Sequence, residues 1–156
     1  MKIIVLKFGG TSVGSIQRIK EVAKIIKSYS RKYKVIVLAS AMSGTTNKLI
    51  NMSLKISKNF PDHEYDTLVS SGEQISCSLL AGQLLENGVK ARSWMAWQIP
   101  IITEGKHKYS RIKYINKNKI FKFLKSGGIP IIAGFQGVDK HSNITTIGRG
   151  GSDSSA

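Results

Sequence analysis

Cysteine, acidic residues and long apolar runs are all scarce in this sequence. The single cysteine, Cys77, cannot form an internal disulfide, and a chain without disulfides is typical of a reducing compartment. The apolar run at residues 3–6 is too short for the core of a signal peptide. No other run approaches the roughly 18 apolar residues of a membrane span. These absences favour a soluble cytoplasmic protein with no membrane partner.

Acidic residues number only 9 against 24 Lys and Arg, so the net charge is +15 and the pI is near 10.1. Such a charge is typical of proteins that bind nucleic acid or an acidic surface. The positive residues are mostly lysines scattered along the chain, and the densest region, residues 106–125, spaces them as a solvated helix face would. We therefore expect general lysine enrichment and no nucleic-acid partner. A nucleic-acid binder stays a distant alternative, which a clustered basic face would favour.

The 156 residues fit one domain, in which apolar runs alternate with helical patterns. This order predicts an α/β fold with a mainly parallel sheet. The apolar runs at residues 3–6, 35–39 and 129–133 predict parallel strands of one sheet, whose exit loops share one edge. Helices are expected over residues 13–28, 64–87 and 116–126 and after the loop at 40–45, shorter strands over 91–95 and 144–146, a hairpin around 109–112, and a loop over 134–143.

Glycine-rich strings stand near both ends of the chain, Lys-Phe-Gly-Gly-Thr-Ser at residues 7–12 and Gly-Arg-Gly-Gly-Ser-Asp at residues 148–153. Glycine allows backbone N–H groups to approach an oxyanion closely, and Lys or Arg neutralises charge there. Neither string is a P-loop, and the signatures of protein kinases are absent. Any phosphoryl chemistry must therefore use another fold.

These strings, together with Ser-Ala-Met-Ser-Gly-Thr-Thr-Asn at residues 40–47 and Ser-Gly-Glu at residues 71–73, resemble the aspartate kinases of the amino acid kinase superfamily. The resemblance covers residues 3–156 in four ordered motifs. It implies a three-layer α/β/α architecture in which residues 1–156 form the N-terminal portion of an amino acid kinase domain. It also implies truncation, because aspartate kinases continue into a C-terminal nucleotide-binding part and ACT domains.

The resemblance also implies an activity. Aspartate kinases transfer phosphate from ATP to L-aspartate and form 4-phospho-L-aspartate and ADP, the first step toward lysine, diaminopimelate, threonine and methionine. Their Mg²⁺ comes with ATP, and we expect no protein-held metal because the three histidines show no ligand spacing. The expected assembly is a homo-oligomer or a complex with the missing C-terminal portion.

Lys7 closes the first predicted strand, so its ammonium should project over the carboxyl edge of the sheet. Phosphoryl transfer needs positive charge on the phosphate oxygens. In the resemblance Lys7 contacts the transferring phosphate, and the amides of Gly9 and Gly10 hold the nucleotide. An ordinary strand-end lysine beside a turn is the plain alternative. By the same resemblance, the nucleotide site also includes Phe8, Ser40, Gly150 and Gly151.

By their positions in the motifs, the resemblance implies that Thr46, Glu73, Arg149 and Ser152 bind aspartate. A hydroxyl at a strand-to-helix turn either caps the helix or binds a carboxylate. Glu73 follows Gly72 inside a long helical pattern, where a glycine indicates a kink or a close backbone approach. A carboxylate there could pair with an α-ammonium, or it could be a solvated residue on the helix face.

Arg149 presents a planar fork that grips a carboxylate in a way a lysine cannot, so it suits the α-carboxylate of the substrate. Asp153 could orient Lys7 and keep it protonated, which makes Lys7 and Asp153 the candidate catalytic residues. The plain alternative is a surface ion pair between Arg149 and Asp153.

An enzyme is the first functional hypothesis. The second is a catalytically inactive remnant, or a fragment of a split protein, that retains the aspartate site. The acceptor could also differ, because relatives phosphorylate glutamate, acetylglutamate, carbamate and nucleotides, although Ser-Gly-Glu and Arg149 favour a free amino acid. We expect this chain alone to turn over ATP and aspartate very slowly or not at all.

Overall fold

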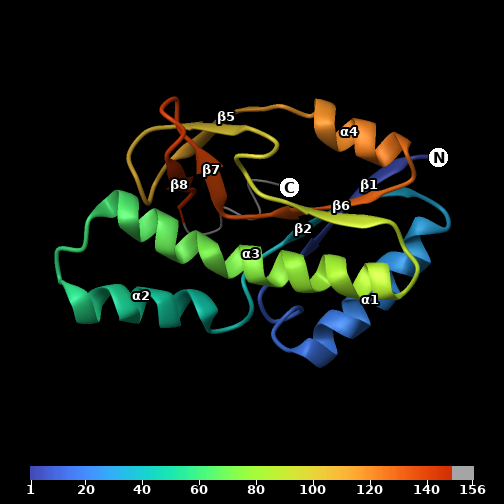
Figure 1. The fold of residues 1–156 in the computed structure, drawn as a ribbon, viewed down its shortest axis with the longest axis horizontal. Coiled ribbons are helices and arrows are strands. Elements are labelled where there is room, and N and C mark those ends of the chain that lie inside the picture. The colour runs from blue at the N-terminus through green and yellow to red at the C-terminus, as the bar shows by residue number, and fades with distance from the viewer. Residues whose placement is uncertain (149–156) are drawn as a thin grey trace.

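A computed structural model describes residues 1–148 of the chain. Two sheets lie side by side along one long central helix, and three shorter helices surround them (Figure 1). In chain order the elements are β1 (Ile3–Phe8), α1 (Ile16–Ser30), β2 (Lys34–Ala39), α2 (Thr45–Ile56), α3 (Asp62–Glu86), β3 (Ala91–Trp94), β4 (Ile101–Glu104), β5 (Arg111–Ile115), α4 (Asn118–Lys125), β6 (Ile129–Ala133), β7 (Gln136–Val138) and β8 (Ile144–Thr146).

The first sheet has the strand order β1-β2-β6-β3, and every neighbouring pair is parallel. The three apolar runs thus form strands of one parallel sheet, as the sequence predicts. The physical reason is burial, since every residue of β6 is buried and strands covered on both faces need apolar side chains throughout.

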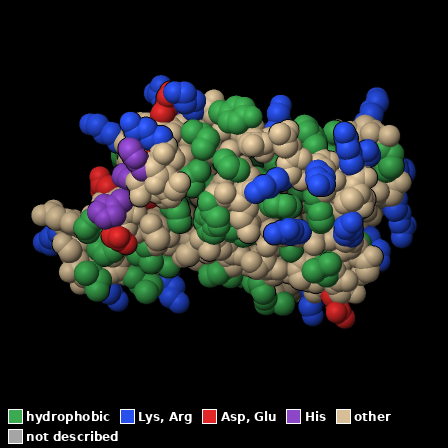
Figure 2. Space-filling view, turned by 45° about the horizontal axis from the view of Figure 1, so that its top comes forward, with side chains coloured by type: hydrophobic (Ala, Val, Ile, Leu, Met, Phe, Trp, Pro, Cys, Tyr) green, Lys and Arg blue, Asp and Glu red, His purple; other side chains and the backbone are tan. Residues whose placement is uncertain are grey.

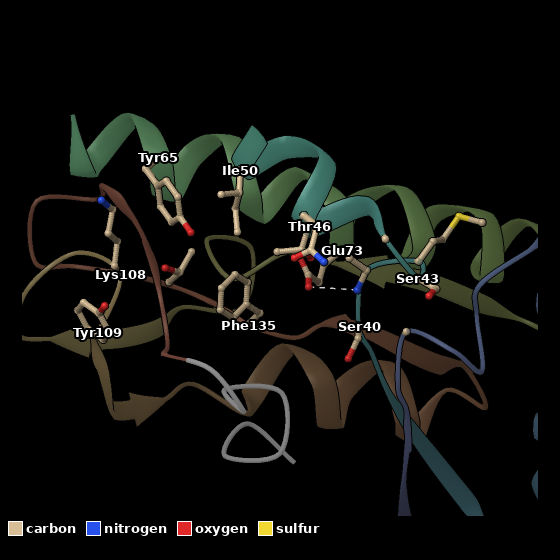
Figure 3. A pocket seen from close by; sticks show the side chains of 15 residues that line it. Ser40, Ser43, Thr46, Ile50, Tyr65, Glu73, Lys108, Tyr109 and Phe135 are labelled. Carbon is tan, nitrogen blue, oxygen red and sulfur yellow. Dashed lines mark hydrogen bonds between the residues drawn. The ribbon is translucent and has the colours of Figure 1, made fainter. Parts of the chain in front are cut away.

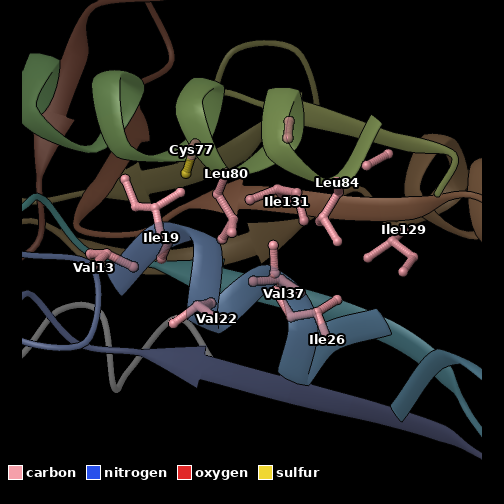
Figure 4. Packing of buried hydrophobic residues seen from close by; sticks show 14 of the residues in the cluster. Val13, Ile19, Val22, Ile26, Val37, Cys77, Leu80, Leu84, Ile129 and Ile131 are labelled. Atoms are coloured by element: carbon pink, nitrogen blue, oxygen red, sulfur yellow. The ribbon is translucent and has the colours of Figure 1, made fainter. Parts of the chain in front are cut away.

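The main hydrophobic core lies between this sheet and the helices α1 and α3 (Figure 4). Helix α1 presents Ile19, Val22 and Ile26 at steps of three and four residues, which places them on one helix face. From α3, Cys77 and Leu80 pack into the same core. A second core, which includes residues of α4, lies on the opposite face of the sheet, so two helical layers enclose the strands as expected.

A second, mixed sheet has the strand order β5-β4-β7-β8. The hairpin of β4 and β5 agrees with the prediction, but the expected loop over 134–143 is wrong because β7 lies within it. Strand β7 carries no apolar run. It forms because it pairs with β4 and β8, and because the buried Gln136 side chain accepts from the Ala96 amide and donates to the Ser70 carbonyl.

The lysine-dense region at 106–125 is also only partly helical, so its interpretation as a single helix face is wrong. Strand β5 occupies its middle, and only α4 is a helix there. Helix α4 begins at Asn118, two residues after the start of the predicted range 116–126: its N-cap is Lys117, and Asn116 Oδ1 accepts from the Asn118 amide.

Helix α3 ends at Glu86, close to the predicted limit of 87, and Gly88 follows its C-cap Asn87. Gly88 has φ +74°, and the Val89 amide donates to the Leu84 carbonyl, which is the hydrogen bond of a helix end that turns through a left-handed residue. The chain therefore leaves α3 sharply and enters β3 beside β6.

Lys and Arg side chains are spread from one end of the molecular face in Figure 2 to the other, with apolar side chains between them. This spread agrees with a general enrichment in surface lysine, and the lack of a nucleic-acid partner stays a prediction. Within residues 1–148, no helix has the length and apolar character that crossing a membrane requires.

Candidate functional site

The loops that follow β1 and β2 meet at the carboxyl edge of the parallel sheet. The Ser40 amide donates to the Phe8 carbonyl at 3.0 Å, and the Ser43 amide donates to the Gly10 carbonyl at 3.1 Å. A Cβ on Gly10 would lie 2.9 Å from the Ala41 carbonyl oxygen, so this close approach requires glycine. The first and second motifs of the sequence thus form one packed unit.

A cavity of about 630 Å³ opens beside this unit. Its wall is drawn from the two loops, α2, α3, the turn between β4 and β5, the connection from β6 to β7, and β8 (Figure 3). The lining residues are Gly10, Ser40, Ala41, Met42, Ser43, Gly44, Thr46, Asn47, Ile50, Tyr65, Glu73, Lys108, Tyr109, Phe135 and Thr146.

The N-terminus of α2 forms one end of this cavity. Its N-cap is Gly44, with φ +78° and no side-chain capping bond, so capping does not engage the predicted hydroxyl of Thr46. The first N–H groups of a helix have no partner within the helix, and the helix dipole is positive there. With Thr46 and Asn47 at the cavity wall, this end suits an anionic group such as a carboxylate.

Gly72 explains how α3 reaches the same end of the cavity. A Cβ at this position would lie 2.8 Å from Ala41 Cβ and 3.3 Å from Thr45 Cγ2. Of the two predicted meanings of this glycine, the structure therefore shows the close approach. It brings the next residue, Glu73, against the loop that follows β2.

Glu73 is buried, with only 3% of its surface exposed, so the alternative of a solvated helix-face residue is wrong. Its Oε1 accepts from the Ala41 amide at 3.1 Å. Its Oε2 is buried and has no hydrogen-bond partner within the described part of the chain. Burial raises the pKa of Glu73 to about 7, although the bond from Ala41 works in the opposite direction. Such a carboxyl group is suited to receive a cation, which would satisfy the unpartnered oxygen.

The structure brings together the predicted residues Gly10, Ser40, Thr46 and Glu73, which all line the cavity. Ser40 is further held by its carbonyl, which accepts from the buried Ser76 hydroxyl at 2.7 Å. Figure 3 shows Thr46 next to Glu73, with Ser40 in the same part of the cavity. Hydroxyl groups and one buried carboxyl group thus share the same end of the cavity.

Lys7, Phe8 and Gly9 stand apart from this cavity wall. Lys7 is exposed at the end of β1, at the same edge of the sheet but not among the lining residues. The Phe8 side chain is partly buried and packs against the main core. The predicted residues Arg149, Gly150, Gly151, Ser152 and Asp153 lie outside the described residues. Thr146, which lines the cavity, precedes that string in the sequence.

Several cavity residues escaped the sequence analysis, namely Tyr65, Lys108, Tyr109, Phe135 and Thr146, together with the buried Asp66 behind them. Asp66 carried a usable signal: it lies seven residues before Glu73, which puts both carboxyl groups on one face of a helix. Lys108 and Phe135 have positive φ values of 68° and 64°, a backbone conformation that the sequence does not indicate for these residue types.

Comparison with known proteins places this geometry in a family. The family model described as the Amino acid kinase family matches residues 2–156. The chain belongs to the amino acid kinase family. Curated relatives within it include the aspartokinase of Rickettsia felis, 46% identical over all of this chain and 40% of the relative. The aspartokinase of Geobacillus stearothermophilus is 49% identical over all of this chain and 39% of the relative. The chain thus spans about two fifths of the length of these relatives.

Solved structures agree with the architecture. The aspartate kinase of Synechocystis has a TM-score of 0.82 at 40% identity, over all of this chain and 26% of that protein. E. coli aspartokinase III in complex with aspartate and ADP has a TM-score of 0.83 at 23% identity, over 98% of this chain and 45% of that protein. The second likeness concerns the fold alone. Both confirm the predicted α/β class with a parallel sheet, and the relatives confirm the resemblance to aspartate kinases.

Proposed function

We propose that this amino acid kinase chain carries the amino-acid side of an aspartate kinase site, which transfers the γ-phosphoryl group of ATP to L-aspartate. One observation supports this most: the buried Glu73 has one carboxyl oxygen without a partner among the described residues, at a cavity that Thr46 and the N-terminus of α2 also line. A free amino acid has the complementary charges. The names of the curated relatives support aspartate as that amino acid.

In this proposal the α-ammonium of aspartate binds Glu73 Oε2. The ammonium needs the ionised carboxylate, so binding favours loss of the proton that burial otherwise retains on Glu73. Because the Ala41 amide already holds Oε1, the carboxylate is oriented before the ligand arrives. Preorganisation of this kind lowers the entropy that binding costs.

The carboxylates of aspartate meet the positive groups of the site. Thr46 and the N-terminus of α2 offer hydrogen-bond donors to one of them. By resemblance, Arg149 takes the α-carboxylate through its fork and Ser152 assists. The β-carboxylate then points toward the edge of the sheet at which Gly10 and Ser40 lie.

On the phosphate side, Lys7 supplies positive charge to the transferring group, with Asp153 orienting it, and the amides around Gly9 and Gly10 receive the phosphates. By resemblance Ser40, Gly150 and Gly151 complete this side. An oxygen of the β-carboxylate attacks the γ-phosphorus in line, the bond to the β-phosphate oxygen breaks, and ADP leaves with the electron pair. The products are 4-phospho-L-aspartate and ADP.

The described residues also bear on the metal. Within residues 1–148, no group of three or more His, Cys, Asp or Glu side chains could hold a metal ion. In the proposal, Mg²⁺ arrives on the phosphates of ATP. When bound there, Mg²⁺ neutralises charge on the phosphate oxygens.

The proposal extends to the pathway, the compartment and the assembly of the protein. As aspartate kinases do, the protein would open the route to lysine, diaminopimelate, threonine and methionine, in the cytoplasm. The homo-oligomer, or the complex with a further C-terminal portion, stays a prediction.

A chimera provides the test of activity. Residues 1–156 replace the matching segment of the G. stearothermophilus aspartokinase, and acyl phosphate is trapped with hydroxylamine in the presence of ATP and L-aspartate. We expect the chimera to form aspartyl hydroxamate and Lys7→Ala to abolish it. We expect the 156-residue chain alone to be very slow or inactive, because misplacing reactants by about 1 Å costs roughly 100-fold in rate.

The same chimera separates the two hypotheses of the sequence analysis. A folded chimera that binds L-aspartate but forms no product would favour an inactive remnant that retains the aspartate site. Arg149→Lys adds a check of the acceptor side: it should weaken aspartate binding far more than nucleotide binding, because a point charge replaces a bidentate fork. Equal losses for both ligands would contradict that role of Arg149.

A further inference from the structure

A second buried carboxyl group lies on the same helix as Glu73 and has no role in the chemistry described above. Asp66 is fully buried, and both of its oxygens accept hydrogen bonds. The His107 ring contacts Oδ2 through Nδ1 at 2.7 Å. The Lys108 amide donates to both oxygens at 3.1 Å, and the Thr146 hydroxyl donates to Oδ1. Asp66 thus joins three elements: α3, the turn between β4 and β5, and β8.

The turn that Asp66 holds is in an unfavourable backbone conformation. Lys108 has φ +68°, where a side chain with a Cβ costs roughly 1–2 kcal/mol relative to the right-handed region. Such a conformation persists only when surrounding contacts enforce it. Three contacts of Lys108 do so: its amide is bonded to Asp66, and its ammonium forms an ion pair with Asp62 and lies over the Tyr65 ring.

This turn and β8 build the end of the cavity that lies away from Glu73. Lys108, Tyr109 and Thr146 all line the cavity, and Figure 3 shows Lys108 and Tyr109 at the opposite end from Glu73. Asp66 and Glu73 are seven residues apart on α3, which corresponds to about 10 Å along the helix axis. Helix α3 therefore carries both Glu73, whose Oε2 is available to a ligand, and Asp66, which is hydrogen-bonded to the opposite wall of the cavity.

We propose that Asp66 is a positioning residue: it holds the β4–β5 turn and Thr146 against α3, and so sets the length of the cavity as measured from Glu73. This inference rests on the proposed function for the identity of the ligand, since the wall would then limit which amino acid fits. Loosening the wall should weaken L-aspartate binding and reduce its preference over the longer L-glutamate.

Strand β8 offers a matched pair of variants. Thr146 donates to Asp66 and lines the cavity, whereas the neighbouring Thr145 shares a buried hydrogen bond with Thr103 at 2.6 Å and does not line it. Thr146→Val and Thr145→Val each remove one buried hydroxyl bond without changing side-chain shape. The two variants should therefore lose similar amounts of unfolding free energy. A difference between them in ligand binding, or in the exchange of the β4–β5 turn, then shows that the bond from Thr146 to Asp66 positions the cavity wall.

The experiment uses the full chain and two measurements. Hydrogen exchange is followed in residues 105–110 without ligand, and calorimetry compares L-aspartate with L-glutamate. We expect Thr146→Val to speed exchange in this segment about fivefold and to weaken aspartate binding about fivefold, as the loss of one buried hydrogen bond predicts. Thr145→Val should leave both within about twofold. Thr146→Ser, which keeps the hydroxyl, should restore both.

Asp66→Asn is the stronger variant, because an amide presents donor hydrogens to the Lys108 amide where a carboxylate accepts. Its effects on the exchange rate and on aspartate affinity should be larger than those of Thr146→Val. If this variant does not fold, the comparison of Thr146→Val with Thr145→Val tests the proposal. Equal effects of Thr145→Val and Thr146→Val, or unchanged exchange in Thr146→Val, would overturn the proposal. If the unsubstituted chain binds no aspartate, the proposed function fails. The hydrogen-exchange measurements then test by themselves whether Asp66 holds the β4–β5 turn against α3.

Discussion

The carboxylate of Glu73 accepts a hydrogen bond from the backbone amide of Ala41 at 3.1 Å, although the two residues are 32 positions apart in the chain. This bond ties the middle of α3 to the loop that follows β2. It occupies one carboxylate oxygen and leaves the other buried without a partner in the described part of the chain. The proposed recognition of an amino acid depends on that remaining oxygen.

Glu73 should lower the stability of the ligand-free protein at neutral and alkaline pH. Its pKa in the folded state is about 7, above the ordinary value of 4.5, so the folded state binds more protons than the unfolded state between these values. The free energy of unfolding should therefore fall as pH rises from 4.5 to 7, by roughly 3 kcal/mol in all, and stay level above that range.

Glu73→Gln tests this directly, because glutamine keeps the oxygen that accepts from Ala41 but cannot ionise. Urea unfolding at pH 5 and pH 8 should show a decline for the unsubstituted chain that the variant lacks. Glu86→Gln, at an exposed position of the same helix, is the matched control and should leave the decline unchanged. A variant with the same decline as the unsubstituted chain would mean that Glu73 ionises freely.

The affinity for L-aspartate should depend on pH through the same group. Since the ammonium binds the ionised carboxylate, the affinity should rise about tenfold per unit as pH approaches 7 from below. It should level off at higher pH. Calorimetry in buffers of different ionisation enthalpy should detect close to one proton released per ligand at pH 5.5 and almost none at pH 8.5. Binding without proton release at pH 5.5 would argue against Glu73 as the partner of the ammonium.

The two glycines of α3 should respond in opposite ways to alanine. At Gly72 the added Cβ would lie 2.8 Å from Ala41 Cβ, and overpacking of this kind costs about 1–3 kcal/mol. At Gly82 nothing lies within 4 Å, so alanine should stabilise the helix by up to about 1 kcal/mol. Chemical unfolding of both variants measures the difference. Equal effects would show that α3 does not approach the loop after β2 so closely.

A similar pair exists in the first glycine-rich string. A Cβ on Gly10 would lie 2.9 Å from the Ala41 carbonyl, whereas one on Gly9 would meet nothing within 4 Å. Gly10→Ala should therefore cost about 1–3 kcal/mol of unfolding free energy, and Gly9→Ala should stay within about 0.5 kcal/mol. Gly9→Ala then provides a folded protein in which the role of this string toward nucleotide can be measured by titration with ATP.

The sequence was sufficient for the parallel sheet because β1, β2 and β6 each contain a continuous apolar run, as parallel strands such as the fully buried β6 require. The same pattern does not show that β1 lies at the edge of the sheet, where Ile3 and Val5 are exposed. The sequence was insufficient for β7, where Gln136, Gly137 and Val138 become a strand only through pairing with β4 and β8. Patterns within a window of a few residues cannot report such partners.

The candidate site also contains residues that the sequence predicts and residues that only the structure shows. Thr46 and Glu73 were predicted through their motifs, and the structure adds the burial that gives Glu73 its chemistry. Only the seven-residue spacing of Asp66 from Glu73 was a local signal; the partners of Asp66, His107 and Lys108, lie 41 and 42 positions away in the chain. Contacts of that range depend on the packing of the second sheet against α3, which no local signal describes.

The most direct test of the proposed amino-acid site compares L-aspartate with succinate, which lacks only the α-ammonium, by calorimetry on the unsubstituted chain and on Glu73→Gln at pH 8. We expect the unsubstituted chain to bind L-aspartate at least about tenfold more tightly than succinate, as a charge-assisted hydrogen bond predicts. The variant should lose that preference while its affinity for succinate changes little. Equal binding of the two ligands by the unsubstituted chain, or an undiminished preference for aspartate in Glu73→Gln, would contradict the assignment.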